Sequence, residues 1–334
     1  MLPDFLDHVK SFALARVIMT AIELDIFRQL EKAPRSRAEL KQRLSIADTP
    51  IADATFDILV AFSILAEENG KLTLLPLSQS VLPVYDSIQS WNKEMELFYS
   101  SLNDFTTVLK SGCYQDTELS DYWVYKNSQD HKEPQLFSVN DYSYVMDASQ
   151  AQLSQTIVEH YDFSVHDHII DFGGGYGRLA ITLAKRNPHL RITIADLPSV
   201  CDGARARVAA AGLGGRIECL PVDFFHDELP TSFADAILFV RVLHDWSYDE
   251  VENLISRTRF CLRRHGVVLV VEPMTDEASD INPSSALSSL MVTLFGGKRR
   301  SVQEHIRILH SAGYQVLSWN DLGLSLYKMV VAQV

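Results

Sequence analysis

The chain has 334 residues, which is more than one hydrophobic core usually supports and therefore favours two domains. Hydrophobic residues make up 47% of the sequence and charged residues 22%, so a folded protein is expected rather than a disordered one. The formal net charge of -13 repels nucleic acid and anionic membranes, and no basic patch is large enough to override it. We therefore expect neither of them as a partner.

The cysteines and the N-terminus indicate the compartment. The four cysteines are far apart and form no Cys-x-x-Cys pair, which argues against a structural zinc site or a redox motif. The N-terminus carries acidic residues where a signal peptide would have basic ones, and no run of about 18 apolar residues occurs. These features predict a soluble, cytoplasmic protein without a metal site.

The first 75 residues combine helical patterns with a hairpin signal. Apolar residues over Phe5–Leu30 follow helical spacing across a wide arc, so we expect helices that are buried on most sides. Ser36 opens a capping box for one short helix, and Thr49-Pro50 opens another. Asn69-Gly70 predicts a β-hairpin over Leu65–Leu75. Two helices before a hairpin are the layout of a winged helix.

From His168 onward, short aliphatic strands alternate with amphipathic helices, which is typical of an α/β fold with a parallel sheet. Element boundaries between residues 84 and 132 cannot be read, and we place the domain boundary so that the domains are residues 1–140 and 141–334. The expected strands are His168–Phe172, Arg191–Asp196, Ile217–Pro221, Ala236–Val240, Val267–Val271, Tyr314–Trp319 and Ser325–Ala332. The expected helices of this half are Arg178–Arg186, Ser199–Ala211, Asp249–Leu262 and one that Ser301 opens and Gly313 closes.

The turn after the first of these strands contains four glycines within five positions, Gly173, Gly174, Gly175 and Gly177. In a doubly wound sheet this turn lies beside the ligand, and glycines let the backbone approach it closely. A dinucleotide fingerprint would need a glycine where Arg178 stands, which weakens the case for pyrophosphate binding. The motif predicts an adenosine-bearing ligand, and a tight turn without a ligand is the alternative.

Acidic residues follow the next two strands. Asp196 lies 19 residues after Gly177, the usual distance for a carboxylate that binds ribose hydroxyls. Asp223 can accept a hydrogen bond from an adenine amino group, and Phe224 offers an apolar face for the ring. Either acid alone could equally cap a helix or a turn. Together they fit an adenosine moiety.

His244 follows the fourth strand and Glu272 follows the fifth. A histidine with a pKa near ~6.5 can take a proton near neutral pH, and a carboxylate at the next strand end could orient its ring. The alternative is a histidine that is satisfied in a turn or caps the following helix. Its place at the carboxyl edge of the sheet, beside the glycine turn, favours a catalytic role.

Five segments in this order and spacing resemble the small-molecule O-methyltransferases of the caffeic acid and hydroxyindole type. They are Asp171–Gly177, Ala195–Pro198, Asp223–Phe225, Val242–Trp246 and Gly296–Lys298. The resemblance covers most of the chain, and it implies S-adenosylmethionine as the cofactor. It also implies a Rossmann-like sheet of seven strands with the last one antiparallel, an N-terminal winged-helix-like dimerisation domain, and a homodimer.

The resemblance assigns roles to individual residues. It implies that His244 is the proton acceptor, that Glu272 orients it, and that Met146 packs near the substrate. The cofactor would be bound by Gly173, Gly175, Asp196, Leu197, Asp223, Phe224 and Arg241. Arg241 lies one position away from the place where members of this family from plants have a lysine that contacts the cofactor.

The chain departs from the plant members at one catalytic position. Where they carry a second carboxylate after Gly-Gly-Lys, this chain has Arg299. Our hypothesis is that Arg299 pairs with a carboxylate of an anionic substrate. A solvated basic turn before the last helix is the alternative.

We therefore expect an O-methyltransferase that acts on a phenolic hydroxyl of a small aromatic metabolite. A C- or N-methyltransferase on the same scaffold is the first alternative. A winged-helix regulator that senses a metabolite is the second, although its recognition helix would carry Asp53 and Asp57 and no Lys or Arg, the wrong charge for DNA. A metal-dependent enzyme is the third, but we interpret His166-Asp167-His168 as a polar turn.

Overall fold

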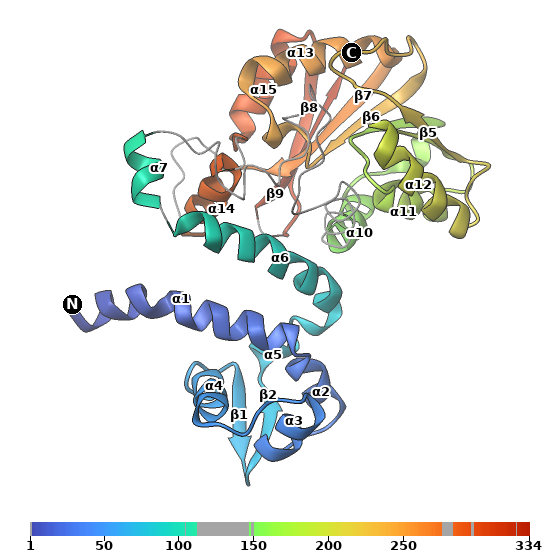
Figure 1. Ribbon diagram of the computed structural model, residues 1–334. Helices are drawn as coiled ribbons and strands as arrows, with labels where there is room; N and C mark the ends of the chain where they lie inside the picture. Colours follow the sequence, from blue (N-terminus) through green and yellow to red (C-terminus); the bar gives the residue numbers. More distant parts are fainter. Residues whose placement is uncertain are drawn as a thin grey trace. The chain divides into compact units, whose positions relative to one another are not determined.

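The computed structural model describes residues 2–103, 105–111, 147, 150–275, 283–294, 297–324 and 326–334. The chain divides into two compact units, an N-terminal unit (Met1–Glu96) and a C-terminal unit (Leu97–Val334) (Figure 1). This division comes earlier than residue 140, where the sequence placed the boundary. The division falls within helix α6 (Tyr85–Leu102), which starts in the N-terminal unit, where the Tyr85 hydroxyl donates a hydrogen bond to the Ile22 carbonyl.

The N-terminal unit begins with two helices, α1 (Leu2–Glu23) and α2 (Ile26–Lys32). The helical pattern over Phe5–Leu30 is interrupted between these helices, where Asp25 takes a left-handed φ of 58°. The remaining elements are α3 (Arg37–Arg43), α4 (Pro50–Ala61), β1 (Leu65–Glu68), β2 (Lys71–Leu74), α5 (Pro76–Gln79) and the 3-10 turn η1 (Leu82–Val84).

The predicted caps and hairpin of this unit are confirmed. Ser36 and Glu39 form the capping box of α3, and Thr49 caps α4. β1 and β2 pair antiparallel, and Asn69 and Gly70 both take positive φ, as a type I′ turn requires. The core of this unit includes Ile26, Phe27, Leu40, Phe56, Leu59, Leu65 and Leu72.

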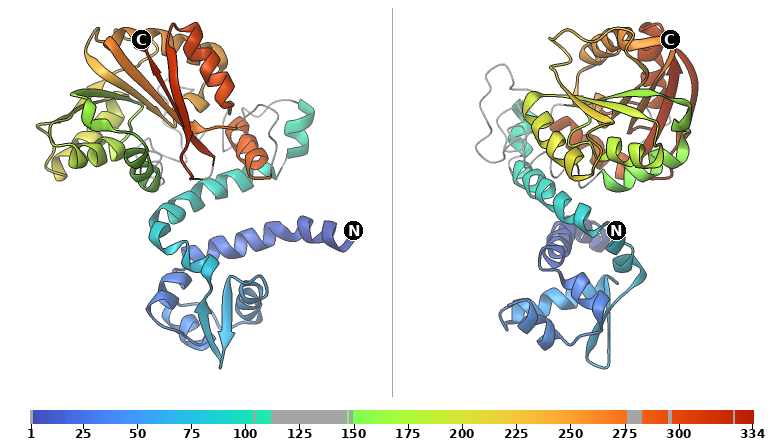
Figure 2. Two further views of the ribbon diagram at one scale, coloured as in Figure 1. Left: turned by 180° about the vertical axis from the view of Figure 1, so that it is seen from behind. Right: turned by 90° about the vertical axis from the view of Figure 1, so that its right-hand side faces the viewer.

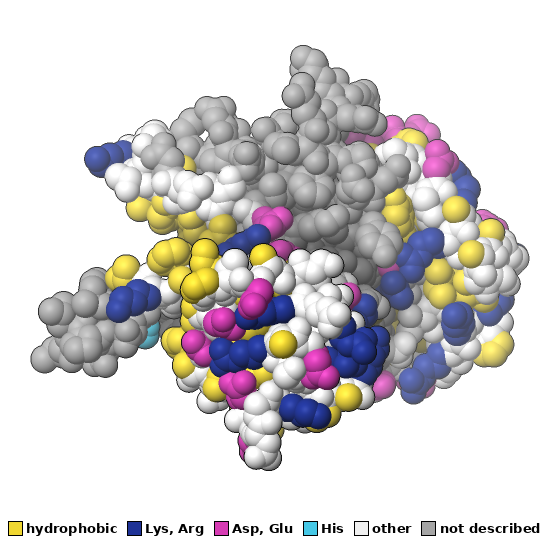
Figure 3. Space-filling view, turned by 60° about the horizontal axis from the view of Figure 1, so that its bottom comes forward, with side chains coloured by type: hydrophobic (Ala, Val, Ile, Leu, Met, Phe, Trp, Pro, Cys, Tyr) yellow, Lys and Arg dark blue, Asp and Glu magenta, His cyan; other side chains and the backbone are white. Residues whose placement is uncertain are grey.

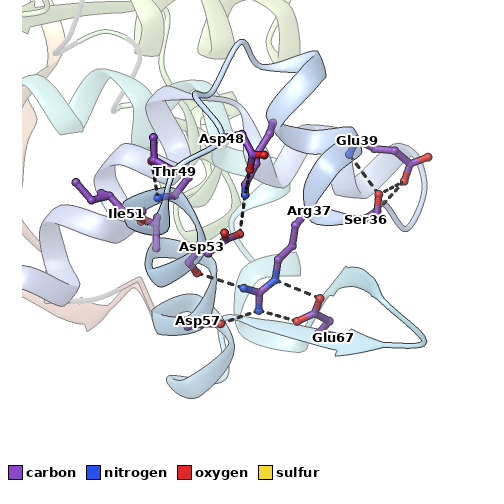
Figure 4. A network of polar contacts seen from close by, with 12 residues as sticks. Ser36, Arg37, Glu39, Asp48, Thr49, Ile51, Asp53, Asp57 and Glu67 are labelled. Carbon is purple, nitrogen blue, oxygen red and sulfur yellow. Dashed lines mark hydrogen bonds and ion pairs between the residues drawn. The ribbon is translucent and has the colours of Figure 1, made fainter.

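A polar network ties α3 to α4 and to the hairpin (Figure 4). The Arg37 guanidinium lies 2.7 Å from Glu67 and 2.8 Å from Asp57, and the Lys41 ammonium lies 2.6 Å from Asp53. The acidic residues of α4 are thus engaged by basic residues of α3. Figure 3 brings the hairpin end of the unit forward, and basic and acidic side chains are interspersed there.

The C-terminal unit is built on a sheet of seven strands in the order β5-β4-β3-β6-β7-β9-β8 (Figures 1 and 2). The strands are β3 (His168–Phe172), β4 (Arg191–Asp196), β5 (Ile217–Pro221), β6 (Ala234–Val240), β7 (Leu262–Pro273), β8 (Gln315–Asp321) and β9 (Tyr327–Gln333). β3 to β7 are parallel, whereas β9 runs antiparallel to both β7 and β8. The expected seven-stranded sheet with an antiparallel last strand is confirmed.

Helices cover both faces of this sheet because successive strand residues point to opposite sides. Ile169 belongs to one core with residues of α10, α11 and α12, and Ile170 belongs to another with residues of α13 and α15. The helices and 3-10 turns are α7 (Phe105–Ser111), α10 (Ala151–His160), η2 (Phe163–Val165), α11 (Arg178–Arg186), α12 (Pro198–Ala210), η3 (Leu243–Asp245), α13 (Tyr248–Thr258), η4 (Arg259–Cys261), α14 (Pro283–Leu294) and α15 (Val302–Ser311). Among the described residues, no helix is both long and apolar enough to cross a membrane.

His166 and His168 lie at the start of β3, at the opposite end from the glycine turn. His166 contacts the Tyr161 hydroxyl at 2.8 Å and Asp235 at 3.2 Å, and His168 contacts the Thr193 hydroxyl at 2.9 Å. Within the described ranges, no three His, Cys, Asp or Glu side chains are grouped as a metal site would need. Both histidines join neighbouring elements of the fold.

Candidate active site

The glycine turn after β3 has the backbone that the motif predicts. Gly173, Gly175 and Gly177 take φ values of 69°, 55° and 81°, which residues with a side chain rarely adopt. A Cβ on Gly173 would lie 2.6 Å from a methyl group of Val242, so the turn packs directly against the segment that carries His244. A Cβ on Gly175 would meet no atom within 4 Å, which leaves open space for a ligand beside this glycine.

Asp196, at the end of β4, holds the glycine turn. Its carboxylate accepts hydrogen bonds from the backbone N–H of Gly175 and of Leu197, both at 2.8 Å. Burial raises the pKa of Asp196 to about 6, although the two N–H groups act to lower it. Burial and the nearby Asp196 raise the pKa of Asp171, at the end of β3, to about 7. Two buried carboxyl groups therefore lie next to the turn.

Asp223 and Phe224 follow β5 at the same edge of the sheet. The Asp223 carboxylate accepts a hydrogen bond from the Phe225 N–H at 2.9 Å and lies 2.9 Å from the His226 ring. It therefore caps its own turn, the alternative that the sequence left open. The Phe224 ring packs edge-on against Phe172, with 6.2 Å between centroids. This apolar surface lies at the carboxyl end of β3 and just beyond the end of β5.

His244 and Glu272 meet at the carboxyl edge, as the sequence predicted. His244 lies in the η3 turn after β6, and its Nδ1 is 2.5 Å from Oε2 of the fully buried Glu272. The other oxygen of Glu272 accepts hydrogen bonds from the backbone N–H of Val242 at 2.8 Å and of Leu243 at 2.7 Å. One carboxylate thus orients the imidazole and the turn that carries it.

Two carboxylates control the charge of His244. Its Nε2 lies 3.2 Å from an oxygen of Asp245, a contact that the sequence analysis missed. Burial lowers the pKa of His244, but Asp245 and Glu272 outweigh burial and raise the pKa above its ordinary value. Burial raises the pKa of Glu272, but His244 outweighs it, so this pKa is lowered. Glu272 therefore stays ionised near neutral pH.

The other expected site residues have mixed outcomes. Arg241 takes a left-handed φ of 59° and donates its backbone N–H to the Val271 carbonyl at 3.0 Å, which joins the ends of β6 and β7. Arg299 is half-buried, and burial lowers its pKa. Its neighbour Lys298 donates its backbone N–H to the His244 carbonyl at 2.7 Å, so the segment lies beside the η3 turn. Met146 lies outside the described residues.

Arg300 is the residue that the sequence analysis missed entirely. Its guanidinium is buried beneath the η3 turn and donates hydrogen bonds to the carbonyls of Leu243 at 2.8 Å and Trp246 at 2.6 Å. The only sequence signal was the paired arginine after Gly296-Gly297-Lys298. A pair of adjacent arginines usually indicates a solvated turn, and no local pattern distinguishes a buried member.

A glycine turn after the first strand, on a sheet whose last strand is antiparallel, is the architecture of a methyltransferase that uses S-adenosylmethionine. Comparison with known proteins then gives the family. The chain belongs to the O-methyltransferase domain family, whose model matches residues 118–315. This match confirms the resemblance that the motifs indicated.

Individual relatives differ in the acceptor that their names give. The 3-hydroxy-5-methyl-1-naphthoate 3-O-methyltransferase of Streptomyces sahachiroi is 37% identical over 153 residues, which are 46% of this chain and 44% of that protein. The N,N-dimethyltransferase OxyT of Streptomyces rimosus is 28% identical over 94% of this chain and 90% of its own length. The structure of human N-acetylserotonin methyltransferase with S-adenosylmethionine has a TM-score of 0.80 at 24% identity, covering 99% and 97% of the two chains, which shows a shared fold.

Proposed function

We propose that this methyltransferase methylates a phenolic hydroxyl of a small aromatic metabolite, with His244 as the general base. The observation that carries the proposal is the pairing of His244 with Glu272 beside the glycine turn. A histidine that only capped a helix would not need a fully buried carboxylate on its ring. The position of the pair, at the edge where the cofactor binds in this fold, supports a direct role in the reaction.

The cofactor would be held by residues at the ends of β3, β4 and β5. We assign the backbone of Gly173 and Gly175 to its amino acid part, Asp196 and Leu197 to the ribose, and Asp223 with Phe224 to the adenine, with Arg241 at the rim. The open space beside Gly175 and the carboxylate of Asp196 fit such a ligand. To bind adenine, Asp223 would exchange its present contact with His226 for the amino group. When bound, S-adenosylmethionine supplies the electrophilic methyl group.

The protein would supply position and a proton acceptor. Methyl transfer to oxygen is an in-line displacement, which is accelerated when donor and acceptor are held close together and away from water. A phenol with a pKa near ~10 is protonated at neutral pH, so removing its proton makes the oxygen a better nucleophile. The ionised Glu272 favours the His244 tautomer with the proton on Nδ1, which leaves Nε2 to act as the base.

Asp245 has two consequences for this mechanism. It lies on Nε2, where the substrate hydroxyl must approach, so substrate binding would replace this contact. After the proton has moved, the His244 imidazolium keeps the Glu272 carboxylate on Nδ1, and Asp245 can return to Nε2 when the product leaves. The carboxylate on Nδ1 stabilises the protonated ring and favours proton transfer from the substrate.

Within this proposal, we expect the acceptor to be an aromatic acid that carries a hydroxyl. The naphthoate named for one relative is such a compound, and the half-buried Arg299 in the segment beside the η3 turn offers a cation to its carboxylate. We expect Arg299→Glu to weaken binding of an acidic substrate at least about 10-fold and to leave its neutral amide unaffected. Steady-state KM values for the two compounds check this, and equal effects on both would contradict the pairing.

An amine acceptor is the second candidate, because the name of the OxyT relative, matched over nearly its full length, gives nitrogen methylation. Incubation with labelled cofactor and a panel of phenols, amines and keto acids, followed by product mass and regiochemistry, separates the candidates. For a phenol, His244→Ala should lose about 10³-fold in kcat while binding the cofactor normally. Undiminished turnover of the phenol by His244→Ala would refute the role of His244 as base.

We also propose that the protein forms a homodimer through its N-terminal unit. Helix α1 exposes Val9 and Phe12, which are 55% and 65% accessible in the single chain. Apolar side chains around a helix indicate burial on more than one side, and a second copy would supply the missing cover. Light scattering after size exclusion measures the mass directly, and a monomer at micromolar concentration would contradict the proposal.

A further inference from the structure

Arg300 is one of the most buried side chains of the C-terminal unit, with 1% of its surface exposed. Burying a guanidinium is costly unless its donors are satisfied, and burial lowers the pKa of Arg300. Its Nη1 donates to the carbonyls of Leu243 and Lys298, and its Nη2 donates to the carbonyl of Trp246. These three bonds to the backbone around His244 offset part of the cost of burial, while Nε is buried without a hydrogen-bond partner in the part of the chain that the structure describes.

These contacts hold the η3 turn on both sides of His244. Leu243 precedes the histidine and Trp246 follows it, at distances of 2.8 Å and 2.6 Å from the guanidinium. Between them, the His244 carbonyl accepts the Lys298 N–H at 2.7 Å. A Cβ on Gly297 would lie 2.3 Å from the same carbonyl, so the two segments touch backbone to backbone.

Glu272 holds the same turn from the other side. Its Oε1 accepts the N–H groups of Val242 and Leu243, and its Oε2 contacts the ring of His244. The turn is thus fixed by an anion that binds its N–H groups and a cation that binds its carbonyls. The N–H donors of arginine are held in a rigid planar group that can reach two carbonyls in a fixed arrangement. The single ammonium group of lysine cannot reproduce this arrangement.

We propose that Arg300 is a positioning residue that sets the place of His244 for proton transfer, and that Gly297 allows the close approach this needs. This inference rests on the proposed role of His244 as base. It gives the Gly297–Arg300 segment a function apart from the substrate contact suggested for Arg299. A displacement of about 1 Å at a reacting group can cost about 100-fold in rate, so a loose turn is expected to lower kcat.

The charged surroundings predict how the pH profile would respond. If the turn loosens, the contact between His244 and Glu272 weakens, so Glu272 raises the pKa of His244 less, while burial still acts to lower it. The pKa of His244 then falls, and the acid limb of the kcat profile moves to lower pH. Among the described residues, the main other groups that act electrostatically on His244, Glu272 or Arg300 are Asp245, Arg241, His305, Glu304, Tyr248 and Glu250, and all of them are retained in the variants.

The test compares Arg300→Lys with Arg307→Lys, a matched change on the exposed side of α15. We expect Arg300→Lys to lose at least about 10-fold in kcat, with KM changed less than about 2-fold, and to shift the acid limb to lower pH. Affinity for S-adenosylhomocysteine and the melting temperature serve as controls for folding. Arg307→Lys should match the wild type in all of these.

Gly297→Ala provides a second variant if Arg300→Lys does not fold, because it changes no charge and is expected to push the segment away from the His244 carbonyl. It should produce the same loss in kcat and the same shift in pH profile. Wild-type kcat and pH profile in a folded variant would overturn the positioning role, provided that His244→Ala is inactive. An active His244→Ala would instead overturn the proposed function, so the two failures can be told apart.

Discussion

The glycine turn after β3 and the η3 turn after β6 lie side by side at one edge of the sheet, but different forces hold them. The glycine turn depends on backbone conformations that glycine adopts without strain, at Gly173, Gly175 and Gly177. The η3 turn instead depends on two buried charges, Glu272 and Arg300, which bind its N–H and carbonyl groups. The glycine turn thus depends mainly on its own residues, with one hydrogen bond to Asp196, whereas the η3 turn depends on charged side chains from two other segments.

Glu272→Gln offers the strongest test of this difference. The amide can donate to Nδ1 of His244, which would place the ring proton on Nε2, the atom that must accept a proton from the substrate. We expect kcat to fall at least about 100-fold, while affinity for S-adenosylhomocysteine changes less than about 3-fold. Single-turnover kinetics and calorimetry measure the two quantities. Parallel losses in both would mean that the two turns are not held independently.

The same contrast explains what the sequence could predict. The aliphatic runs predicted strands such as His168–Phe172 and Arg191–Asp196 with the bounds that the structure has, because buried parallel strands are nearly all apolar. The glycine turn and the pairing of His244 with Glu272 were also predicted, since both follow strand ends. Those features depend on topology, which the alternation of elements specifies.

Contacts that depend on tertiary packing could not be predicted. Arg300 lies 54 positions from Trp246, and nothing in its local sequence distinguishes it from the half-buried Arg299. The break at Asp25 was missed because apolar spacing continues through it, although its backbone is left-handed. The contact of Asp245 with His244 was missed because neighbouring side chains in a strand or helix point apart, and the η3 turn brings them together.

Substitutions in the glycine turn should show a smaller effect of a different kind. In Gly173→Ala, the new Cβ would lie 2.6 Å from a methyl group of Val242, and the residue would also be strained by its positive φ. In Gly175→Ala, only the strain of the positive φ is expected. We expect Gly173→Ala to weaken S-adenosylhomocysteine binding about 10-fold or more. For Gly175→Ala, strain of about 1 kcal/mol should weaken S-adenosylhomocysteine binding by about 5-fold. When Gly173→Ala is added to a Val242→Ala variant, it should lower the affinity for S-adenosylhomocysteine less than it does in the wild type. An equal loss in both backgrounds would contradict the clash with Val242 as the cause.

The smallest expected effect is the pH dependence of cofactor binding through Asp196. Its pKa of about 6 lies above the ordinary value because of burial, so the group loses its charge over a range in which exposed carboxylates remain ionised. A carboxylate that accepts from Gly175, Leu197 and ribose hydroxyls binds best when ionised. Between pH 7.5 and 5.5 the ionised fraction falls to about a quarter, so affinity for S-adenosylhomocysteine should fall about 4-fold.

Calorimetry across this pH range measures the effect, and Asp196→Asn is the control because it keeps the shape but cannot titrate. The variant should bind weakly at every pH without the 4-fold change. If the variant keeps the slope, the titrating group is another one, and Asp171, with a pKa of about 7, is the buried neighbour to replace next. Either result would show whether the charge of Asp196, which already holds the backbone of Gly175, also contributes to cofactor binding.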